Sequence, residues 1–310
     1  MVKKIGLVGI SEGNGHPYSY SVIMNGFHEQ HFKKSGWDVI YKYVKKRDIS
    51  EIGFDNSEIT HIWTQDLEIS TSIAKSCKIE HIVEDYKDMI GHVDAVLIAR
   101  DDYENHLLMA KPFLEAGLKV FIDKPLTVDE EELNYYKPFL LSGQLMSFSG
   151  MRYAIELDDI RSNLAEFGKL KCIQSTVIND WNKYGIHLID AVLGLIPFEP
   201  KSIEYIQGSE GIFVILFENG LAWTITTLEE VPKTFNINIW GSNKRESIEV
   251  NDNFSMFRRL LWRFVKLVET NEMHYEPRDT LLAICLLIAG NISRKERRIV
   301  YLDEFKESLK

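Results

Sequence analysis

The stretch KIGLVGISEGNGHP, residues 4–17, decides the fold class of this chain. Its first part, Lys4 to Ile10, is a mostly apolar run that predicts a buried strand. A glycine-rich turn follows, and Pro17 suits the first turn of a helix. A strand, such a turn and a helix in this order can bring backbone amides against a pyrophosphate, so the stretch predicts a dinucleotide site.

The glycine spacing in this loop is irregular. A strict GxGxxG that began at Gly9 would need glycines at positions 11 and 14, which are Ser11 and Asn14. A flexible turn between a strand and a helix explains the loop equally well. The candidate cofactor contacts in the loop are Gly9, Ser11, Gly13, Asn14, Gly15 and His16.

The first half of the chain alternates apolar runs with amphipathic stretches. The pattern predicts strands at residues 4–10, 59–64, 94–99, 119–122 and 145–149, and helices from about 17, over 67–76, over 106–116 and from about 128. Continuous apolar strands that alternate with helices are typical of a parallel sheet covered on both faces. We therefore expect an α/β domain of the Rossmann type.

The second half has a different pattern. It predicts a helix over residues 184–195 and strands over 212–218, 221–227, 235–240 and 247–250. The pair Asn219-Gly220 between two alternating runs is a strong hairpin signal. We expect an α+β domain with an open, mainly antiparallel sheet. The pattern changes near Gly150, so the prediction is a dinucleotide-binding domain at 1–150 and a substrate-binding and dimerisation domain at 151–310.

Composition restricts the class of protein. The chain has 310 residues and a net charge of −10, and its short basic clusters are diluted by acids, which argues against a nucleic-acid partner. Its three cysteines form no CxxC pair, so neither a metal site nor a disulfide framework is expected. The longest apolar stretch, residues 281–290, is too short to span a bilayer. We expect a soluble, cytoplasmic protein with no membrane partner.

A lysine follows the predicted strand at 119–122, in the turn Asp123-Lys124-Pro125. The carboxyl end of a parallel strand is where such sheets bind ligands. Lys124 is therefore a candidate for catalysis and for cofactor or substrate contact, although the same three residues also suit a plain turn.

The stretch KYGIHLID, residues 183–190, places three polar side chains on one face of a predicted helix: Lys183, His187 and Asp190. A histidine with a carboxylate three residues later could be held in one tautomer for proton transfer. A helix with a solvated polar face explains the same spacing. Asp180, just before this helix, could act in catalysis or serve as its N-cap.

Arg152 and Tyr153 follow the last predicted strand of the first half. The guanidinium of Arg152 could bind an anionic or hydroxyl-rich substrate. An interdomain salt bridge is the equal alternative. Both residues are candidate substrate contacts.

These stretches together resemble the Gfo/Idh/MocA family of oxidoreductases, which includes glucose–fructose oxidoreductase and inositol dehydrogenase. The segment LEAGLKVFIDKPLT, residues 114–127, is similar to the family pattern of a helix end, a strand and an acidic residue followed by Lys-Pro. The family usually has Glu where Asp123 stands. By this resemblance Lys124 contacts nicotinamide and substrate, and Asp123, Ala99, Arg100 and His106 also lie at the cofactor.

A second family motif, Asp-x-Gly-x-His-x-x-Asp, is matched in part. Gly185, His187 and Asp190 fit, but Lys183 stands where the family has its catalytic Asp. A cation cannot orient a histidine as a carboxylate does. The resemblance also covers GMRY at 150–153, which is similar to the segment that leads into the family's substrate domain.

The resemblance implies an oxidoreductase that uses NAD or NADP on a hydroxyl or keto group of a sugar-like molecule. Lys124 and His187 would act together at the reacting carbon, with Lys183 nearby as a second cation. The alternatives are a non-catalytic dinucleotide-binding sensor on the same fold and the family's NAD-dependent glycosidase branch. Family members commonly pair through the open sheet, so a homodimer or homotetramer is expected.

Cofactor choice depends on the end of the second strand, where an acid usually binds the ribose. Thr64 stands at that place, and Asp66 follows two residues later. Loss of the acid removes a repulsion against a 2′-phosphate, so NADP would be tolerated unless Asp66 takes over the role.

Overall fold

The computed structural model describes residues 2–208 and 211–309, which fall into two compact units. The first unit comprises Met1–Leu126, Pro138–Phe148 and Phe257–Pro277, and the second comprises Thr127–Lys137, Ser149–Met256 and Arg278–Lys310. Both units are discontinuous in sequence, so they differ from the ranges 1–150 and 151–310. The functions expected for those ranges remain predictions.

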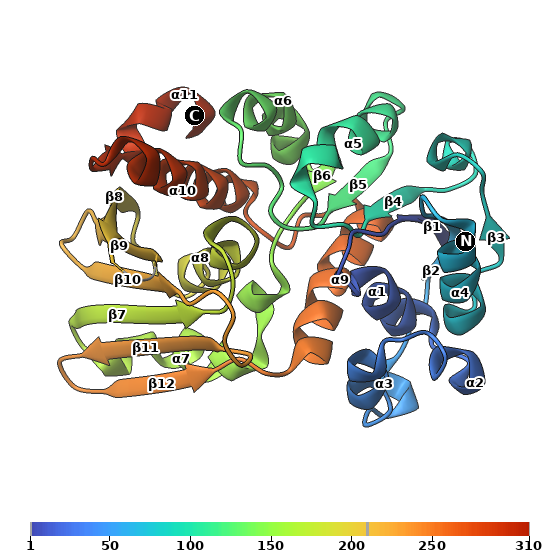
Figure 1. Ribbon diagram of the computed structural model, residues 1–310, viewed down its shortest axis with the longest axis horizontal. Helices are drawn as coiled ribbons and strands as arrows, with labels where there is room; N and C mark the ends of the chain where they lie inside the picture. The colour runs from blue at the N-terminus through green and yellow to red at the C-terminus, as the bar shows by residue number, and fades with distance from the viewer. Residues whose placement is uncertain (1, 209–210, 310) are drawn as a thin grey trace. The chain divides into compact units, whose positions relative to one another are not determined.

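A six-stranded parallel sheet forms the centre of the first unit (Figure 1). Its strand order is β3-β2-β1-β4-β5-β6, and every neighbouring pair is parallel. The strands are β1 (Lys3–Val8), β2 (Ser57–Trp63), β3 (His81–Ile82), β4 (Ala95–Ile98), β5 (Lys119–Ile122) and β6 (Leu145–Met146). The Rossmann-type sheet predicted from the sequence is confirmed.

Helices connect these strands. Early in the chain they are α1 (His16–Asn25), α2 (Glu29–Phe32), α3 (Asp38–Val44), α4 (Leu67–Cys77), α5 (His106–Glu115) and α6 (Glu130–Leu141). Four of them lie at predicted places, whereas α2 and α3 were not predicted. Every residue of β4 is buried, as expected for a strand covered on both faces.

A helix from late in the chain completes the core of the first unit. From Phe257 onward, α9 (Asn253–Thr270) belongs to this unit. The ring of Phe257 packs edge-on against that of Tyr20 of α1, with 5.4 Å between the ring centroids. The centroids of Phe264 and of Phe121 in β5 are 5.9 Å apart. The sequence pattern did not assign α9 to the first domain.

A seven-stranded sheet forms the second unit, in the order β12-β11-β7-β10-β9-β8-β13. The strands are β7 (Leu170–Val177), β8 (Pro200–Gln207), β9 (Gly211–Phe217), β10 (Ala222–Thr227), β11 (Phe235–Gly241), β12 (Arg245–Glu249) and β13 (Val300–Tyr301). All neighbours are antiparallel except β7 and β10, which are parallel. The predicted open, mainly antiparallel sheet is confirmed.

One face of this sheet is buried and the other is open. On β9 the inward residues Phe213 and Ile215 are fully buried, while Leu216 is 43% exposed. The remaining helices are α7 (Asp158–Asn163), α8 (Ile186–Leu193), α10 (Pro277–Glu296) and α11 (Lys306–Leu309). The indole N–H of Trp181 donates to the Leu287 carbonyl of α10 at 2.9 Å, which ties the start of α8 to that helix.

No helix in the described ranges 2–208 and 211–309 is long and apolar enough to cross a membrane.

Candidate functional site

The predicted cofactor residues of the first unit lie at one edge of its sheet. β1 has β2 on one side and β4 on the other, so the direction of the chain reverses there. Ligands of open α/β sheets bind at such a switch point, outside the carboxyl ends of the strands. Because the strands are parallel, the loops after β1, β2, β4 and β5 all begin at this edge.

The loop after β1 needs its glycines for two reasons. A Cβ atom on Gly9 would lie 2.7 Å from Pro17, and one on Gly15 would lie 2.6 Å from the Trp37 ring, so both positions are tightly packed. Gly13 has a φ of +73° and nothing within 4 Å of its Cβ position. Gly13 is therefore the glycine whose backbone is open to the close approach of a phosphate.

The N-terminus of α1 offers few free amide donors. The N–H of His16 donates to Oδ1 of Asn14 at 2.7 Å, and Pro17 has no N–H. A standard phosphate-binding helix directs such donors at the ligand. In this irregular loop, the side chain of Asn14 therefore already uses one of the amide donors at the start of α1.

Asp123, at the end of β5, is the centre of a buried polar cluster. Its Oδ2 contacts Nδ1 of His16 and accepts from Nδ2 of Asn14 at 3.2 Å. Its Oδ1 accepts from the Tyr20 hydroxyl at 3.2 Å and from the N–H of Lys124 at 2.9 Å. The carboxylate therefore joins the loop after β1, helix α1 and the turn after β5.

Burial alone would raise the pKa of Asp123, because a carboxylate loses hydration. The His16 ring and the charge of Lys124 act against burial, together with the Lys124 N–H. Together they hold the pKa of Asp123 well below its usual range. Asp123 is therefore ionised at neutral pH, and Nδ1 of His16 donates the hydrogen in their contact.

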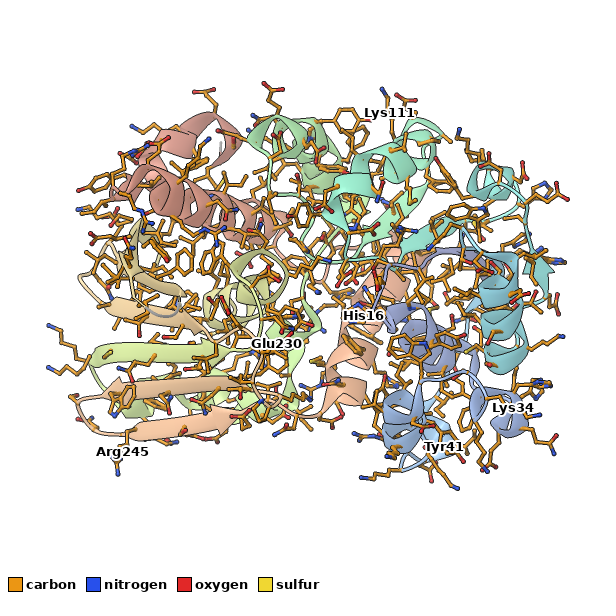
Figure 2. The ribbon with its side chains drawn as sticks, in the orientation of Figure 1. His16, Lys34, Tyr41, Lys111, Glu230 and Arg245 are labelled. Atoms are coloured by element: carbon orange, nitrogen blue, oxygen red, sulfur yellow. The ribbon has the colours of Figure 1, made fainter. Side chains whose placement is uncertain are left out.

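His16, labelled in Figure 2, has Nδ1 in contact with Asp123, and its Nε2 is available. Its ring stacks on that of Tyr20, with 5.2 Å between the centroids, and meets the ring of Phe257 edge-on, with 4.9 Å between the centroids. These two contacts fix the orientation of the His16 ring. Its side chain is 18% exposed, and within the described part of the chain no hydrogen bond reaches Nε2. His16 can therefore present Nε2 to a ligand at the start of α1.

The amine of Lys124 lies against a carboxylate that the sequence reasoning missed. Nζ of Lys124 is 3.8 Å from Oδ2 of Asp101, and the two side chains are only 6% and 14% exposed. The Ser11 hydroxyl donates to Oδ1 of Asp101 at 2.6 Å, and the N–H of Asp101 donates back to it at 3.2 Å. Ser11, predicted as a cofactor contact, thus holds Asp101.

The residues after β4 form a second ion pair. Arg100 donates from Nε and Nη2 to both carboxylate oxygens of Asp102, at 2.8 and 2.5 Å. Its Nη1 donates to Oε1 of Gln65 at 2.9 Å. The Gln65 side chain also accepts from the N–H of Ile10 and donates to its carbonyl. Ala99, also predicted at the cofactor, is fully buried at the end of β4.

His106, predicted at the cofactor, braces the backbone in this structure. Its two ring nitrogens lie 3.0 Å from the carbonyl of Leu126 and 2.9 Å from the carbonyl of Arg100. The side chain is fully buried. It therefore fixes the loops after β4 and β5 relative to one another.

At the end of β2, Thr64 is occupied and Asp66 is partly free. The Thr64 hydroxyl donates to the carbonyl of Asp66 at 2.6 Å and contacts Ser70. Oδ1 of Asp66 caps α4 by accepting from the N–H groups of Glu68 and Ile69. Oδ2 of Asp66 has no partner within the described residues, so it is the oxygen available to a ribose hydroxyl.

In the second unit, His187 and Asp190 are joined through a serine that the sequence reasoning missed. Nδ1 of His187 lies 2.6 Å from the Ser149 hydroxyl, and Asp190 accepts the N–H of Ser149 at 2.6 Å. The alternative of a solvated helix face is wrong, because His187 and Asp190 are 7% and 2% exposed. That face of α8 is therefore buried.

Asp190 is a carboxyl group under strong burial. Burial is the main cause that raises its pKa to about 7, and Asp279 adds to it, against Arg152 and the Ser149 N–H. Its Oδ1 has no hydrogen-bond partner in residues 2–208 and 211–309. The group is therefore poised to change charge near neutral pH.

Arg152 pairs with Asp279, and both residues lie in the second unit. The salt-bridge alternative is confirmed in part, but the bridge lies within one unit rather than between domains. Nη1 of Arg152 also approaches the Asp190 carbonyl at 3.4 Å. Tyr153 is buried in the same turn, Gly150–Tyr153, with 7% exposure.

Lys183 lies in a π-helical turn, Trp181–Gly185, that precedes α8. The predicted helix therefore begins irregularly, and Lys183 is half-buried rather than placed on a regular helix face. Oδ1 of Asp180 accepts the N–H of Lys183 at 2.9 Å, so the N-cap interpretation of Asp180 is confirmed.

The described ranges contain no group of three or more His, Cys, Asp or Glu residues placed to hold a metal ion. The cluster around Asp123 and Lys124 and the cluster around His187 and Asp190 instead combine carboxylates with lysine, arginine and imidazole. Such groups suit proton transfer and the binding of anions or hydroxyls.

A family model matches residues 41–137. Its description is an oxidoreductase family with an NAD-binding Rossmann fold, GFO_IDH_MocA. The resemblance predicted from the sequence is confirmed. No curated protein matches the chain by sequence.

Solved structures with the same fold cover nearly the whole chain. Apo scyllo-inositol dehydrogenase from Lactobacillus casei is 15% identical, covers 97% of this chain and 98% of its own, and has a TM-score of 0.76. Myo-inositol 2-dehydrogenase from Lactobacillus plantarum is 15% identical, covers 97% and 99%, and has a TM-score of 0.77. The Lactobacillus casei enzyme with bound NAD(H) and scyllo-inositol is 15% identical, covers 98% and 100%, and has a TM-score of 0.76.

Proposed function

We propose that this chain, whose residues 41–137 match the NAD-binding oxidoreductase family described above, is an NAD(P)-dependent dehydrogenase or reductase. Its substrate would be a sugar-like molecule with a hydroxyl or keto group. The observation that carries the proposal is the buried Lys124 amine just past the end of β5, at the switch-point edge of a Rossmann sheet.

The residues at this edge fit a dinucleotide. Gly13 would let the pyrophosphate approach the loop backbone, and His16 would present Nε2 to the ligand at the start of α1. The bound dinucleotide would accept or supply the hydride. The chain would supply binding, orientation and the proton.

Asp66 favours NAD over NADP in this proposal. Its unpartnered Oδ2 can accept a hydrogen bond from a ribose hydroxyl, and its charge would repel a 2′-phosphate. Thr64, at the position first expected to choose the cofactor, has its hydroxyl committed to Asp66 and Ser70.

We assign Lys124 to proton transfer with the reacting oxygen. Oxidation requires a group that takes the hydroxyl proton as the hydride leaves, and reduction requires the same group as an acid. His187, with its orientation fixed by Ser149, is the proposed second acid–base group. Lys183 remains a proposed catalytic residue, as a second cation. Arg152 and Tyr153 remain proposed substrate contacts, with Arg152 already neutralised by Asp279.

The substrate class is proposed as cyclic or open polyols. The similar solved structures include dehydrogenases that act on inositols. Oligomerisation through the open face of the second sheet, to a homodimer or homotetramer, is part of the proposal. Light scattering on a gel-filtered sample would decide it.

The second candidate is a dinucleotide-binding sensor without turnover. Lys183, in place of the expected catalytic carboxylate, and the self-bonded start of α1 favour it. Turnover of any polyol would exclude it.

The decisive experiment mixes the protein with NAD or NADP and with myo-inositol, scyllo-inositol and a range of hexoses and their acids. We expect reduced nicotinamide to appear with at least one of them. His187→Ala should lower that rate by roughly 10²–10⁴-fold, as is typical of a lost acid–base group. Dinucleotide binding without turnover would favour the sensor, and no binding at millimolar concentration would overturn both candidates.

A further inference from the structure

The Lys124 amine is buried at the end of β5, next to carboxylates from the same unit. A buried ammonium without a counter-charge is costly, so a lysine as buried as Lys124, at 4% exposure, requires a compensating group.

Two carboxylates interact with Lys124, namely Asp123, whose oxygens also accept hydrogen bonds from other groups, and Asp101; the neighbouring Asp102 is paired elsewhere. Asp123 accepts from His16, Asn14, Tyr20 and the backbone of Lys124. Asp102 is held by Arg100 through both oxygens, and Asn105 donates to it as well. The carboxylate opposite the Lys124 amine is that of Asp101, at 3.8 Å.

Asp101 is fixed where it stands. The Ser11 hydroxyl donates to Oδ1, and the N–H of Asp101 donates to the same hydroxyl oxygen. This two-point contact ties the loop after β1 to the loop after β4 and leaves Oδ2 toward Lys124. With 14% of its side chain exposed, Asp101 is poorly screened by solvent.

We propose that Asp101 is the positioning residue for Lys124. Asp101 holds the amine at the carboxyl edge of the sheet through the opposite charge of its carboxylate. Ser11 fixes the carboxylate in turn. The inference rests on the proposed function for its catalytic meaning, but the pair itself can be tested without a substrate.

The charge of Asp101 and its hydrogen bond with Ser11 can be separated by one substitution. Asp123 precedes Lys124 in the chain and is paired with His16, while Asp101 approaches the amine from the loop after β4. If Asp101 only braced Ser11, an asparagine would serve equally well, since its amide oxygen can still accept from the Ser11 hydroxyl. Asp101→Asn therefore distinguishes a charge role from a bracing role.

The test measures how fast the Lys124 amine is acetylated. The full-length protein is labelled with trace acetic anhydride at pH 7.5, and peptides are quantified by mass spectrometry relative to Lys111, an exposed lysine on α5 (Figure 2). Only the uncharged amine reacts. Asp101→Asn removes the opposite charge beside the amine, so it should raise the acetylation rate of Lys124 relative to Lys111 severalfold.

Two further variants make the result specific. Asp101→Glu keeps the charge and should return the rate toward that of the wild type. Glu269→Gln removes the carboxylate of a comparable pair, Lys266–Glu269 at 2.9 Å in the same unit, and should leave Lys124 labelling unchanged. Equal labelling of Lys124 in wild type and Asp101→Asn, or the same increase in Glu269→Gln, would overturn the proposal.

Turnover adds a separate readout. With any substrate found above, Asp101→Asn should lower kcat and move its pH profile while the KM for the dinucleotide stays within about threefold of the wild type, and Asp101→Glu should restore part of kcat. A loss that Glu does not restore would overturn the positioning role. If the wild type turns over nothing, the proposed function fails, and the labelling result still decides whether Asp101 holds Lys124.

Discussion

Lys124 can be tested by removing its amine while keeping its length. Lys124→Met should abolish turnover, because the proton can no longer be transferred, while dinucleotide binding should stay within a few fold of the wild type. Met is unbranched and fills a similar volume, so the buried site should fold. Stopped assays of product measure turnover, and fluorescence titration with reduced nicotinamide measures binding.

Full activity in Lys124→Met would contradict the mechanism. Loss of dinucleotide binding together with turnover would instead show that Lys124 acts in binding the cofactor. Lys111→Met, on the exposed side of α5, is the matched control and should change neither quantity.

Asp190 should make the protein less stable as the pH rises. Its pKa in the folded state is raised to about 7, above the value of about 4 in an unfolded chain, so the folded state binds the proton more tightly. The cost of ionising the buried group is absent below pH 4 and complete above pH 7. Asp190→Asn removes this cost, so the free energy of unfolding of the variant relative to the wild type should rise by about 2–3 kcal/mol between pH 5 and pH 8.

Urea unfolding at the two pH values measures this difference. Asp303→Asn, at an exposed carboxylate of the same unit, should show no such change. A difference between Asp190→Asn and wild type that is constant with pH would show that Asp190 stays ionised in the folded protein.

Sequence patterns identified the proposed acid–base side chains, but not the residues that contact them in the folded protein. Lys124 and His187 could be found because each follows a recognisable local pattern. Asp101 and Ser149 could not, because each meets its partner through folding rather than through spacing: 23 positions separate Asp101 from Lys124, and 38 separate Ser149 from His187. The parallel order of β4 and β5 was the available signal that the loop after β4 would lie near Lys124.

At the scale of elements, Asp66 links cofactor choice to the start of α4. Asp66→Ala should lower the free energy of unfolding by about 1 kcal/mol through loss of the cap, whereas Asp66→Asn keeps a good N-cap and should be close to neutral. Both variants remove the charge, so the preference for NAD over NADP should fall roughly fivefold, or about 1 kcal/mol, in each.

Titration with NADH and NADPH and unfolding in urea together measure the two effects. A preference unchanged in both variants would show that Asp66 acts only as a cap. If Asp66→Ala loses the preference for NAD over NADP and Asp66→Asn keeps it, the choice of cofactor depends on a hydrogen bond rather than on charge.

The sequence predicted five of the six strands of the first unit's sheet, with small errors at their ends, but it did not predict β3, α2, α3 or α9. Buried parallel strands carry nearly continuous apolar runs, so β1, β2, β4 and β5 were recognisable. In the second unit β7 and β8 were not predicted. Their residues mix polar and apolar side chains, since one face of this sheet is open.

Helix α9 was not predicted, although its buried residues follow a helical pattern. Phe254, Phe257, Leu261 and Phe264 follow helical spacing, and all four are buried. Nothing in that spacing says which core the face joins. The structure assigns most of α9 to the first unit, more than 100 residues after the last strand of its sheet.

At the scale of the whole molecule, the cofactor should stabilise one unit more than the other. A dinucleotide at 100 times its Kd adds about 2.7 kcal/mol to the state that binds it. The proposed binding residues, from Gly9 to Lys124, lie in the first unit. Differential scanning calorimetry should therefore show that NAD moves the transition of the first unit upward, and if both units melt together the whole transition should move.

Adenosine monophosphate carries part of the cofactor and serves as the control, with a smaller shift expected. No shift with NAD or NADP at millimolar concentration would contradict dinucleotide binding. A shift with NADP alone would contradict the role given to Asp66.

The return of α9 to the first unit affects how the protein is made. A ribosome delivers the strands of the Rossmann sheet first, but the rings that cover Tyr20 and Phe121 arrive only with Phe257 and Phe264. Until then the nascent first unit exposes aromatic surface that chaperones recognise. The unit that begins the chain therefore finishes folding late, after most of the second unit has been synthesised.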